Sequence, residues 1–210
     1  MTYADDLKAR IITSLLPSLG MDEVLGAEVR FGDGRFRADL VVASTRRLSA
    51  IEVKGPRDNL DRLAEQAIGY RTMFLDFTVA IAPDFVGAVR GLLPRETGIM
   101  IVSPDRSDWV RRPTTKRRLP KEAALQWLRT ADLRNLLSQH ALPSNGVYED
   151  LAERARGSLS TEILSEFALH SVAMRLGERY NAFVRELGRT VTLDDVRVLT
   201  LGDRITSSSD

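Results

Sequence analysis

One short stretch of this chain carries the residue types that phosphodiester chemistry needs. Asp39 lies within a run of apolar and β-branched residues, and Glu52 and Lys54 end a second such run. Carboxylate and carbonyl oxygens bind hard divalent cations, and an ammonium group beside them can stabilise negative charge that develops on a phosphate. These residues could therefore hold a metal ion and a metal-activated water against a phosphodiester.

The two runs that carry these residues predict a β-hairpin. Residues 36–43 and 48–54 are short and apolar, and the polar sequence Ser-Thr-Arg-Arg separates them. If Ala43 pairs with Leu48, the register also fixes which side chains share a face, because alternate residues of a strand point the same way. In this register Asp39 lies opposite Glu52, and the side chains expected on their face are Arg37, Asp39, Val41, Glu52 and Lys54.

Two opposed carboxylates need compensation. Directly opposed residues have Cβ atoms about 5 Å apart, and two carboxylates at that distance repel by roughly 3 kcal/mol at an effective dielectric of about 20. A divalent cation would offset this repulsion. A shared proton would also offset it, as would Lys54 or Arg37 as a counter-charge, so the spacing leaves a metal site and an ion-pair cluster both open.

The order of these residues resembles the bipartite core of the PD-(D/E)XK nuclease superfamily. Asp39 is followed, after a short gap, by Glu52-Val53-Lys54, and Ala38 stands where the superfamily has a proline that it is known to vary. Members include restriction endonucleases, Holliday-junction resolvases and the nuclease domains of RecB-type enzymes. The resemblance extends over residues 28–83 and, more weakly, into the helical tail.

A second element strengthens this resemblance. Residues 59–74 carry an apolar stripe at helical spacing, with Gln66 and Tyr70 four residues apart on its edge. This spacing resembles the Q-x-x-x-Y element that RecB-like members carry on the helix after the lysine strand. By itself, Gln66 could equally be a polar residue at the border of a buried helix face. The run from Asp58 to Tyr70 also looks like a poorly characterised bacterial branch of the superfamily.

The resemblance implies a nuclease that depends on Mg²⁺ or Mn²⁺. DNA is a more favoured substrate than RNA, and an endonuclease is favoured. The metal ligands would be Asp39, Glu52 and the backbone carbonyl of Val53, and Glu28 is a further candidate because many members place an acid upstream of the aspartate. The implied catalytic residues are Asp39, Glu52, Lys54 and Gln66.

Other residues are expected to bind the nucleic acid. Tyr70 would contact a phosphate next to the scissile one, and Arg37, Arg57 and Arg62 would clamp phosphates, although Arg37 could instead pair with Glu28. A basic run within residues 106–121 could neutralise further phosphates or could be a solvated linker. Its candidate contacts are Arg111, Arg112, Arg117 and Arg118. A catalytically idle module of the same fold, binding nucleic acid or another partner, is the alternative.

Composition limits the other classes of function. The 210 residues are 43% hydrophobic, which suffices for a core, and the net charge is only +1. Without cysteine there is no disulfide or thiolate site, which fits a reducing cytoplasm. Charged residues interrupt the longest apolar region, 74–93, so no membrane segment is expected. The chain also lacks a GxxxxGK[ST] loop, which argues against an ATP-driven activity.

The hydrophobic pattern predicts an α/β fold with a restriction-endonuclease-like αβββαβ core, a mixed central sheet and a C-terminal helical extension. Within the core, residues 1–105, we expect helices at 3–16, 59–74 and 84–93, and strands at 24–31, 36–43, 48–54, 76–82 and 98–102. A basic linker or ribbon (106–122) would lead to the helical extension (123–190), with a long helix at 160–187 that Gly188 caps, and residues 203–210 are expected to be disordered. The extension would pack on the sheet or on a second copy, which would form a homodimer.

Overall fold

The protein is described by a computed structural model over residues 3–32, 34–55, 58–103 and 106–200, with a six-stranded mixed sheet at its centre. The strands follow one another across the sheet in chain order. The first three form an antiparallel meander, the third to fifth are parallel, and the sixth is antiparallel. The strands are β1 (Val24–Phe31), β2 (Phe36–Ala43), β3 (Leu48–Lys54), β4 (Asp76–Ile81), β5 (Gly98–Val102) and β6 (Ser107–Arg111).

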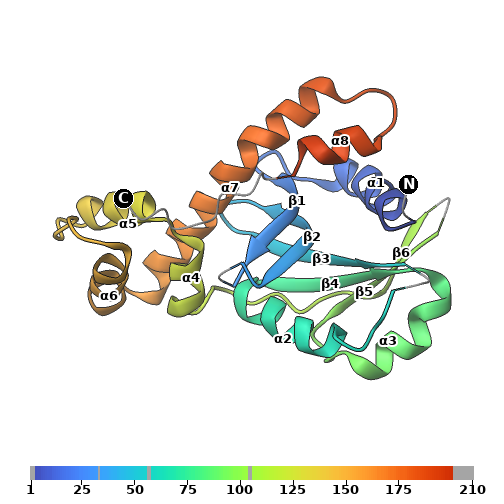
Figure 1. Ribbon diagram of the computed structural model, residues 1–210, viewed down its shortest axis with the longest axis horizontal. Helices are drawn as coiled ribbons and strands as arrows, with labels where there is room; N and C mark the ends of the chain where they lie inside the picture. Colours follow the sequence, from blue (N-terminus) through green and yellow to red (C-terminus); the bar gives the residue numbers. More distant parts are fainter. Residues whose placement is uncertain (1–2, 33, 56–57, 104–105, 201–210) are drawn as a thin grey trace.

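Helices cover both faces of the sheet, and a helical unit extends from one end (Figure 1). The first and last helices lie over one face, the second and third lie over the other, and the long helix α7 connects the helical unit with the sheet. The helices are α1 (Tyr3–Leu15), η1 (Leu16–Ser18), α2 (Leu63–Met73), η2 (Pro83–Phe85), α3 (Val86–Leu92), α4 (Lys121–Trp127), α5 (Thr130–Gln139), α6 (Tyr148–Ser158), α7 (Thr161–Glu186) and α8 (Leu193–Val198).

The two faces of the sheet bury separate apolar clusters because neighbouring strand residues point to opposite sides. On β3, Leu48 and Ala50 join the cluster on the α2 side, whereas Ile51 and Val53 join the cluster on the α1 side. Strands that are buried on both faces read as continuous apolar runs. This burial explains why β3 and β4 are apolar almost throughout and why a polar residue inside them stands out.

The helical extension packs on the sheet of the same chain. The Trp127 indole N–H of α4 donates to the Met73 carbonyl at the end of α2 over 2.7 Å, and the Leu119 N–H donates to Ser165 Oγ of α7 over 2.9 Å. Leu176 of α7 belongs to the same apolar cluster as the sheet residues on the α2 side. This one apolar cluster contains residues of both the core and the extension. The predicted division into a core, a linker and an extension therefore stays a prediction.

Most predicted element bounds are confirmed, with three differences. The second helix begins at Leu63 and not at residue 59, because the preceding residues form hydrogen-bonded turns. Within the expected linker or ribbon, β6 pairs antiparallel with β5 as a sixth strand of the sheet. The long helix ends at Glu186 with Leu187 as its C-cap, so Gly188 does not cap it. The tail predicted at residues 203–210 lies outside the described residues.

We expect Gly98→Ala to lower the free energy of unfolding by about 1–3 kcal/mol, because the added methyl overpacks a close contact between β4 and β5. A Cβ at this position would lie 2.5 Å from Thr78 Oγ1 and 2.8 Å from Pro113 Cδ. Gly87→Ala is the matched control, since no described heavy atom lies within 4 Å of its Cβ. Urea denaturation of both variants measures the difference, and equal midpoints would contradict the packing.

Candidate functional site

Three carboxylates lie at one level across β1, β2 and β3. The pairing of β1 with β2 places Glu28 opposite Asp39, and the pairing of β2 with β3 continues to the position where Asp39 faces Glu52. We call Glu28, Asp39 and Glu52 the acid row. The predicted hairpin register is thereby confirmed. The flanking pairs that fix it are Ala27 with Leu40, Val29 with Ala38, Leu40 with Ile51 and Ala43 with Leu48.

The backbone is irregular where the first two acids face each other. Glu28 has a φ of 55°, which is uncommon for a residue with a side chain. Ala27 joins the apolar cluster on the α1 side but Val29 joins the one on the α2 side, although simple alternation would put both on one face. Strained backbone of this kind is often kept at functional sites. Here it turns the first acid of the row toward neighbouring polar groups.

Three cations compensate the acid row. From α1, the Lys8 ammonium lies 2.9 Å from Asp39 Oδ1 and also donates to Glu28 Oε1. Arg37 Nε lies 2.6 Å from Glu28 Oε2, as the alternative for this arginine predicted. Lys54 Nζ lies 2.8 Å from Glu52 Oε1. The three carboxylates and three cations are balanced in formal charge.

The other oxygens of Asp39 and Glu52 are also held. Beyond the pair of Leu40 with Ile51, the Val53 backbone N–H donates to Asp39 Oδ2 over 2.8 Å, so this carboxylate takes the place of a backbone acceptor between the strands. The Tyr70 hydroxyl of α2 donates to Glu52 Oε2 and lies 3.1 Å from the carbonyl oxygen of Arg37. Asp39 is therefore fixed by the neighbouring strand β3, and Glu52 by the helix α2.

The electrostatics of Glu52 and Tyr70 reflect this crowding. Burial and the neighbouring charge of Asp39 raise the pKa of Glu52, although Lys54 and the Tyr70 hydroxyl act in the opposite direction. Burial and the charge of Glu52 also raise the pKa of Tyr70, so its hydroxyl stays protonated and can donate. The raised pKa of Glu52 therefore reflects first its burial and then the neighbouring charge of Asp39.

Not every predicted residue points into this site. Tyr70 is 1% exposed and stacks on Phe77 at a centroid distance of 4.2 Å, so its hydroxyl holds Glu52 and is not presented to a phosphate. Gln66 lies one turn earlier on α2, half-buried, and its side chain makes no hydrogen bond to another described residue. Arg62 is exposed at the start of the same helix. Arg57 lies outside the described residues.

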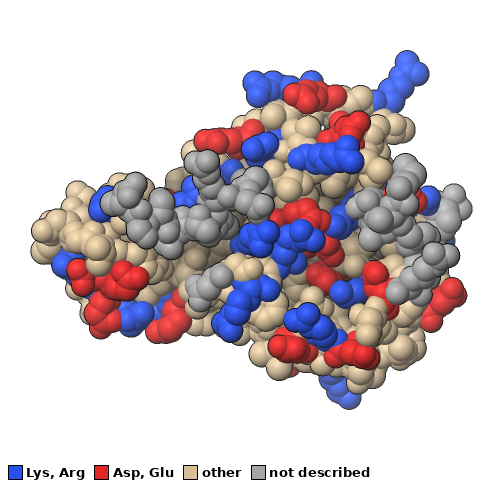
Figure 2. All heavy atoms as spheres, viewed as in Figure 1, with Lys and Arg blue, Asp and Glu red and all other residues tan. Residues whose placement is uncertain are grey.

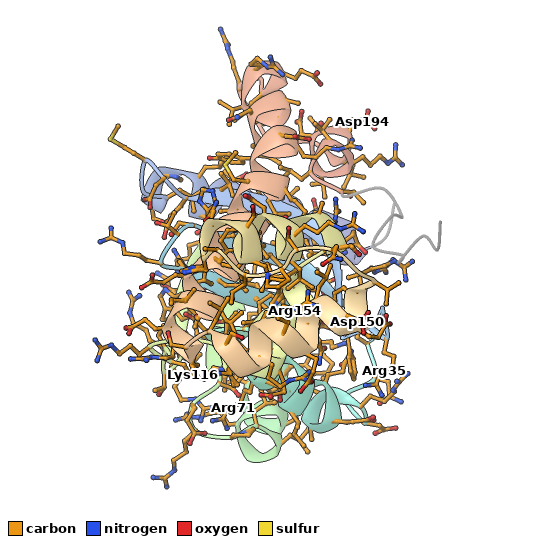
Figure 3. The ribbon with its side chains drawn as sticks, turned by 90° about the vertical axis from the view of Figure 1, so that its left-hand side faces the viewer. Arg35, Arg71, Lys116, Asp150, Arg154 and Asp194 are labelled. Carbon is orange, nitrogen blue, oxygen red and sulfur yellow. The ribbon has the colours of Figure 1, made fainter. Side chains whose placement is uncertain are left out.

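The basic run is partly used inside the fold. Arg111 donates to the carbonyls of Thr97 and Pro94 over 2.8 and 2.9 Å, and Arg118 pairs with Glu162 at 3.6 Å. Arg112 lies over the Trp109 ring, and both Arg112 and Arg117 are exposed. Figure 3 shows Lys116 beside Arg71, whose carbonyl accepts a hydrogen bond from the Lys116 ammonium. Binding of nucleic acid by this run stays a prediction.

Sequence reasoning missed Lys8, although one signal was present. Lys8 lies at helical spacing from Ile12 and Leu15, on the apolar face of the first helix, where a charged residue requires a partner. Burial lowers the pKa of Lys8, but Asp39 and Glu28 outweigh this effect, so the pKa is raised. The helix could be predicted, but the pattern of one helix does not reveal which acids it faces.

Asp39 and Glu52 are of the residue types that bind Mg²⁺ or Mn²⁺, but each of their oxygens is engaged by Lys8, the Val53 N–H, Lys54 or the Tyr70 hydroxyl. Across the described residues, no three His, Cys, Asp or Glu side chains form a group that could hold a metal on their own. Mg²⁺, however, is commonly bound by one or two carboxylates together with water and substrate phosphates. Asp39, Glu52 and the Val53 carbonyl carry hard oxygen donors of this kind, so metal binding here stays a prediction.

The surroundings of the site carry mixed charge. Figure 2 shows Lys and Arg side chains around a group of Asp and Glu side chains on the face over the central strands. The Arg37 side chain is 57% exposed and that of Asp39 is 17% exposed, so the site is reached from solvent at its Arg37 end. Among the helices that the structure describes, none has the length and apolar character to cross a membrane.

Comparison with known proteins places the chain in a family. A family model described as Bacteriophage P4 protein cII matches residues 2–200. Protein cII of Enterobacteria phage P4 is 27% identical over 179 residues, which cover 82% of this chain and 67% of that protein. A solved structure of a protein of unknown function from Silicibacter pomeroyi is 19% identical in sequence, with a TM-score of 0.47. The match covers 67% of this chain and 92% of that protein's chain. The chain thus belongs to the bacteriophage P4 protein cII family.

Proposed function

We propose that this chain is a Mg²⁺- or Mn²⁺-dependent nuclease with a restriction-endonuclease-like core, and that DNA is its more favoured substrate. The observation that carries the proposal is the convergence of Asp39 and Glu52 from neighbouring strands beside the Lys54 ammonium. Asp39 is held in place by the Val53 N–H and Glu52 by the Tyr70 hydroxyl. Fixed geometry of this kind is what catalysis by positioned groups requires.

The order of elements supports the same proposal. One helix, an antiparallel three-stranded meander, a crossover helix and a parallel strand follow one another from α1 to β4. This is the αβββαβ order expected from the sequence. The acids occur on β1, β2 and β3, and the crossover helix α2 carries Tyr70, which donates to Glu52, and Gln66, for which no contact with the acids is seen among the described residues.

The metal would be held by Asp39 and Glu52 with the backbone carbonyl of Val53. When bound, Mg²⁺ or Mn²⁺ supplies a Lewis acid for a phosphoryl oxygen and lowers the pKa of a coordinated water. Lys54 is close enough to Glu52 to position this water or to stabilise negative charge on the phosphate. Arg37, the most exposed side chain among these groups, would meet a neighbouring phosphate.

An idle binding module of the same fold is less well supported. Such a module would depend on the basic run for contact with phosphates, but Arg111, Lys116 and Lys121 donate to backbone carbonyls inside the fold. It would also have no use for buried opposed carboxylates, which raise the free energy of the folded state. Glu52 is 7% exposed at its side chain and still lies next to another acid.

We expect the purified chain to cleave supercoiled plasmid DNA with Mg²⁺ or Mn²⁺ but not with EDTA. Asp39→Asn and Lys54→Ala should each lower the cleavage rate by about 100-fold or more, because each removes a group that would act on the metal or the phosphate. Glu65→Gln is the control, since Glu65 is exposed on α2 and lies outside the acid row. Cleavage that survives in EDTA or in Lys54→Ala would exclude this mechanism.

Tyr70→Phe should weaken Mn²⁺ binding or cleavage by about 10- to 100-fold, because it removes the donor that orients Glu52 while keeping the buried ring. Tyr148→Phe is the matched control. Tyr148 also donates its hydroxyl to a backbone carbonyl, that of Leu125, but in the helical unit away from the acids. Calorimetric titration with Mn²⁺ checks both variants, and equal affinities would show that Tyr70 does not position Glu52.

A further inference from the structure

Trp109 is an exposed tryptophan on the outermost strand of the sheet. It lies on β6, which pairs with β5 and ends the order of the strands (Figure 1). Trp109 is 39% exposed, whereas Trp127, the other tryptophan of the chain, is 4% exposed. Tryptophan is enriched at binding surfaces, because its large ring contributes much apolar contact area. The proposed reaction does not use this ring.

The surroundings of the exposed ring are positively charged. The Arg112 guanidinium lies over the ring, 5.1 Å from its centroid. Arg112 is itself exposed, and among the described residues it makes no ion pair with an acid. Asp108 pairs with Arg106 instead, at 2.7 Å. A flat aromatic ring beside a cation without a counter-charge suits a ligand that has both a flat face and a negative charge, as a nucleotide does.

Positive charge also gathers at the end of β6. Burial lowers the pKa of Arg111, and the charges of Arg90 and Arg95 lower it further, although Glu96 acts in the opposite direction. Arg90 and Arg95 are exposed. Like charges that are held close together raise the local positive potential, which attracts a polyanion.

Trp109 lies at the level of the acid row. The register leads from Trp109 through β5 and β4 to Val53, which follows Glu52 on β3. Adjacent strands lie about 4.8 Å apart, so three strand spacings place β6 roughly 14 Å from β3. One strand of nucleic acid can therefore contact both β6 and the acid row.

We propose that Trp109 and Arg112 form a platform on which a base of single-stranded DNA stacks, so that this chain binds DNA with an unpaired segment. This inference rests on the proposed function for its substrate class. The bases of a duplex are stacked on their neighbours, so only an unpaired base can offer its face to a tryptophan ring. Trp109 would contact this base and Arg112 its phosphate, and stacking of this kind tolerates any sequence.

A strand from another protein fits this edge less well. A free strand edge can accept a strand of a second copy, but charged side chains and a bulge disfavour such pairing. The strand β6 has both features. The side chains of Arg106 and Asp108 are 76% and 52% exposed, and the register between β5 and β6 shifts between Ile99 and Met100.

Intrinsic fluorescence tests the platform without a metal. Trp127 is buried and donates its indole N–H to the Met73 carbonyl, so a base that stacks on a tryptophan must stack on Trp109. We expect an oligothymidylate of about 16 nucleotides to quench the emission of the full chain in EDTA. The same strand paired with its complement should quench much less. EDTA prevents metal-dependent cleavage, so this measurement reports binding alone.

Substitutions separate stacking from charge. Trp109→Ala should weaken binding of a labelled oligothymidylate, measured by fluorescence anisotropy, by about tenfold or more, whereas Trp109→Phe keeps a ring and should stay within about threefold. Arg112→Gln should reduce the steepness of log affinity against log salt by about 0.7, the value for one phosphate contact on a single strand. Met174→Ala and Arg179→Gln are the matched controls, because both residues are exposed on α7, and each should bind with wild-type affinity.

The outcomes distinguish this inference from the proposed function. Equal quenching by single and double strands, or unchanged affinity of Trp109→Ala for the single strand, would exclude the platform even in a chain that cleaves DNA. Quenching by the single strand, in a chain that cleaves no DNA with Mg²⁺ or Mn²⁺, would support the platform and contradict the nuclease. If Trp109→Ala keeps its affinity but converts a dimer into a monomer in sedimentation, the surface is a protein interface and the inference is wrong.

Discussion

Repulsion among Glu28, Asp39 and Glu52 is the constraint on which the rest of the structure depends. The three acids lie side by side on adjacent strands, and each is largely removed from solvent. Carboxylates in such a row are tolerated only when cations and hydrogen-bond donors contact them. Removing a charge from water costs several kcal/mol for each ion, and this cost is on the order of the whole stability of a domain. Local cations balance the formal charge, and burial together with the charge of Asp39 raises the pKa of Glu52.

The layers of the fold supply this compensation from both sides of the sheet. On one face, α1 is held by buried apolar residues and brings Lys8 to the first two acids. On the other face, α2 packs through Tyr70 and Phe74 and brings a hydroxyl to Glu52. The β2–β3 hairpin adds a backbone N–H to Asp39 where the ladder of the two strands ends. Apolar packing on each side thus determines where the polar groups of the site can stand.

The strands and the hairpin register could be predicted from sequence because they depend on local patterns. Short β-branched runs and a polar turn suffice to pair Ala43 with Leu48, and this pairing places Asp39 opposite Glu52. The contact of Lys8 with this pair could not be predicted, since it depends on how one helix packs on the sheet. For the same reason, the sequence did not show that Tyr70 turns inward to Glu52, or that Arg111 and Lys116 donate to carbonyls. Residue type and spacing identified the acids, but tertiary packing decides which cation meets each one.

The proposed function requires that Asp39 and Glu52 together hold a divalent cation beside Lys54. Crystals soaked in Mn²⁺, with diffraction measured near the manganese absorption edge, would locate the ion directly by anomalous scattering. The proposed function predicts a strong peak within bonding distance of Asp39, Glu52 and the Val53 carbonyl. A peak at another place, or no peak at saturating Mn²⁺, would contradict it.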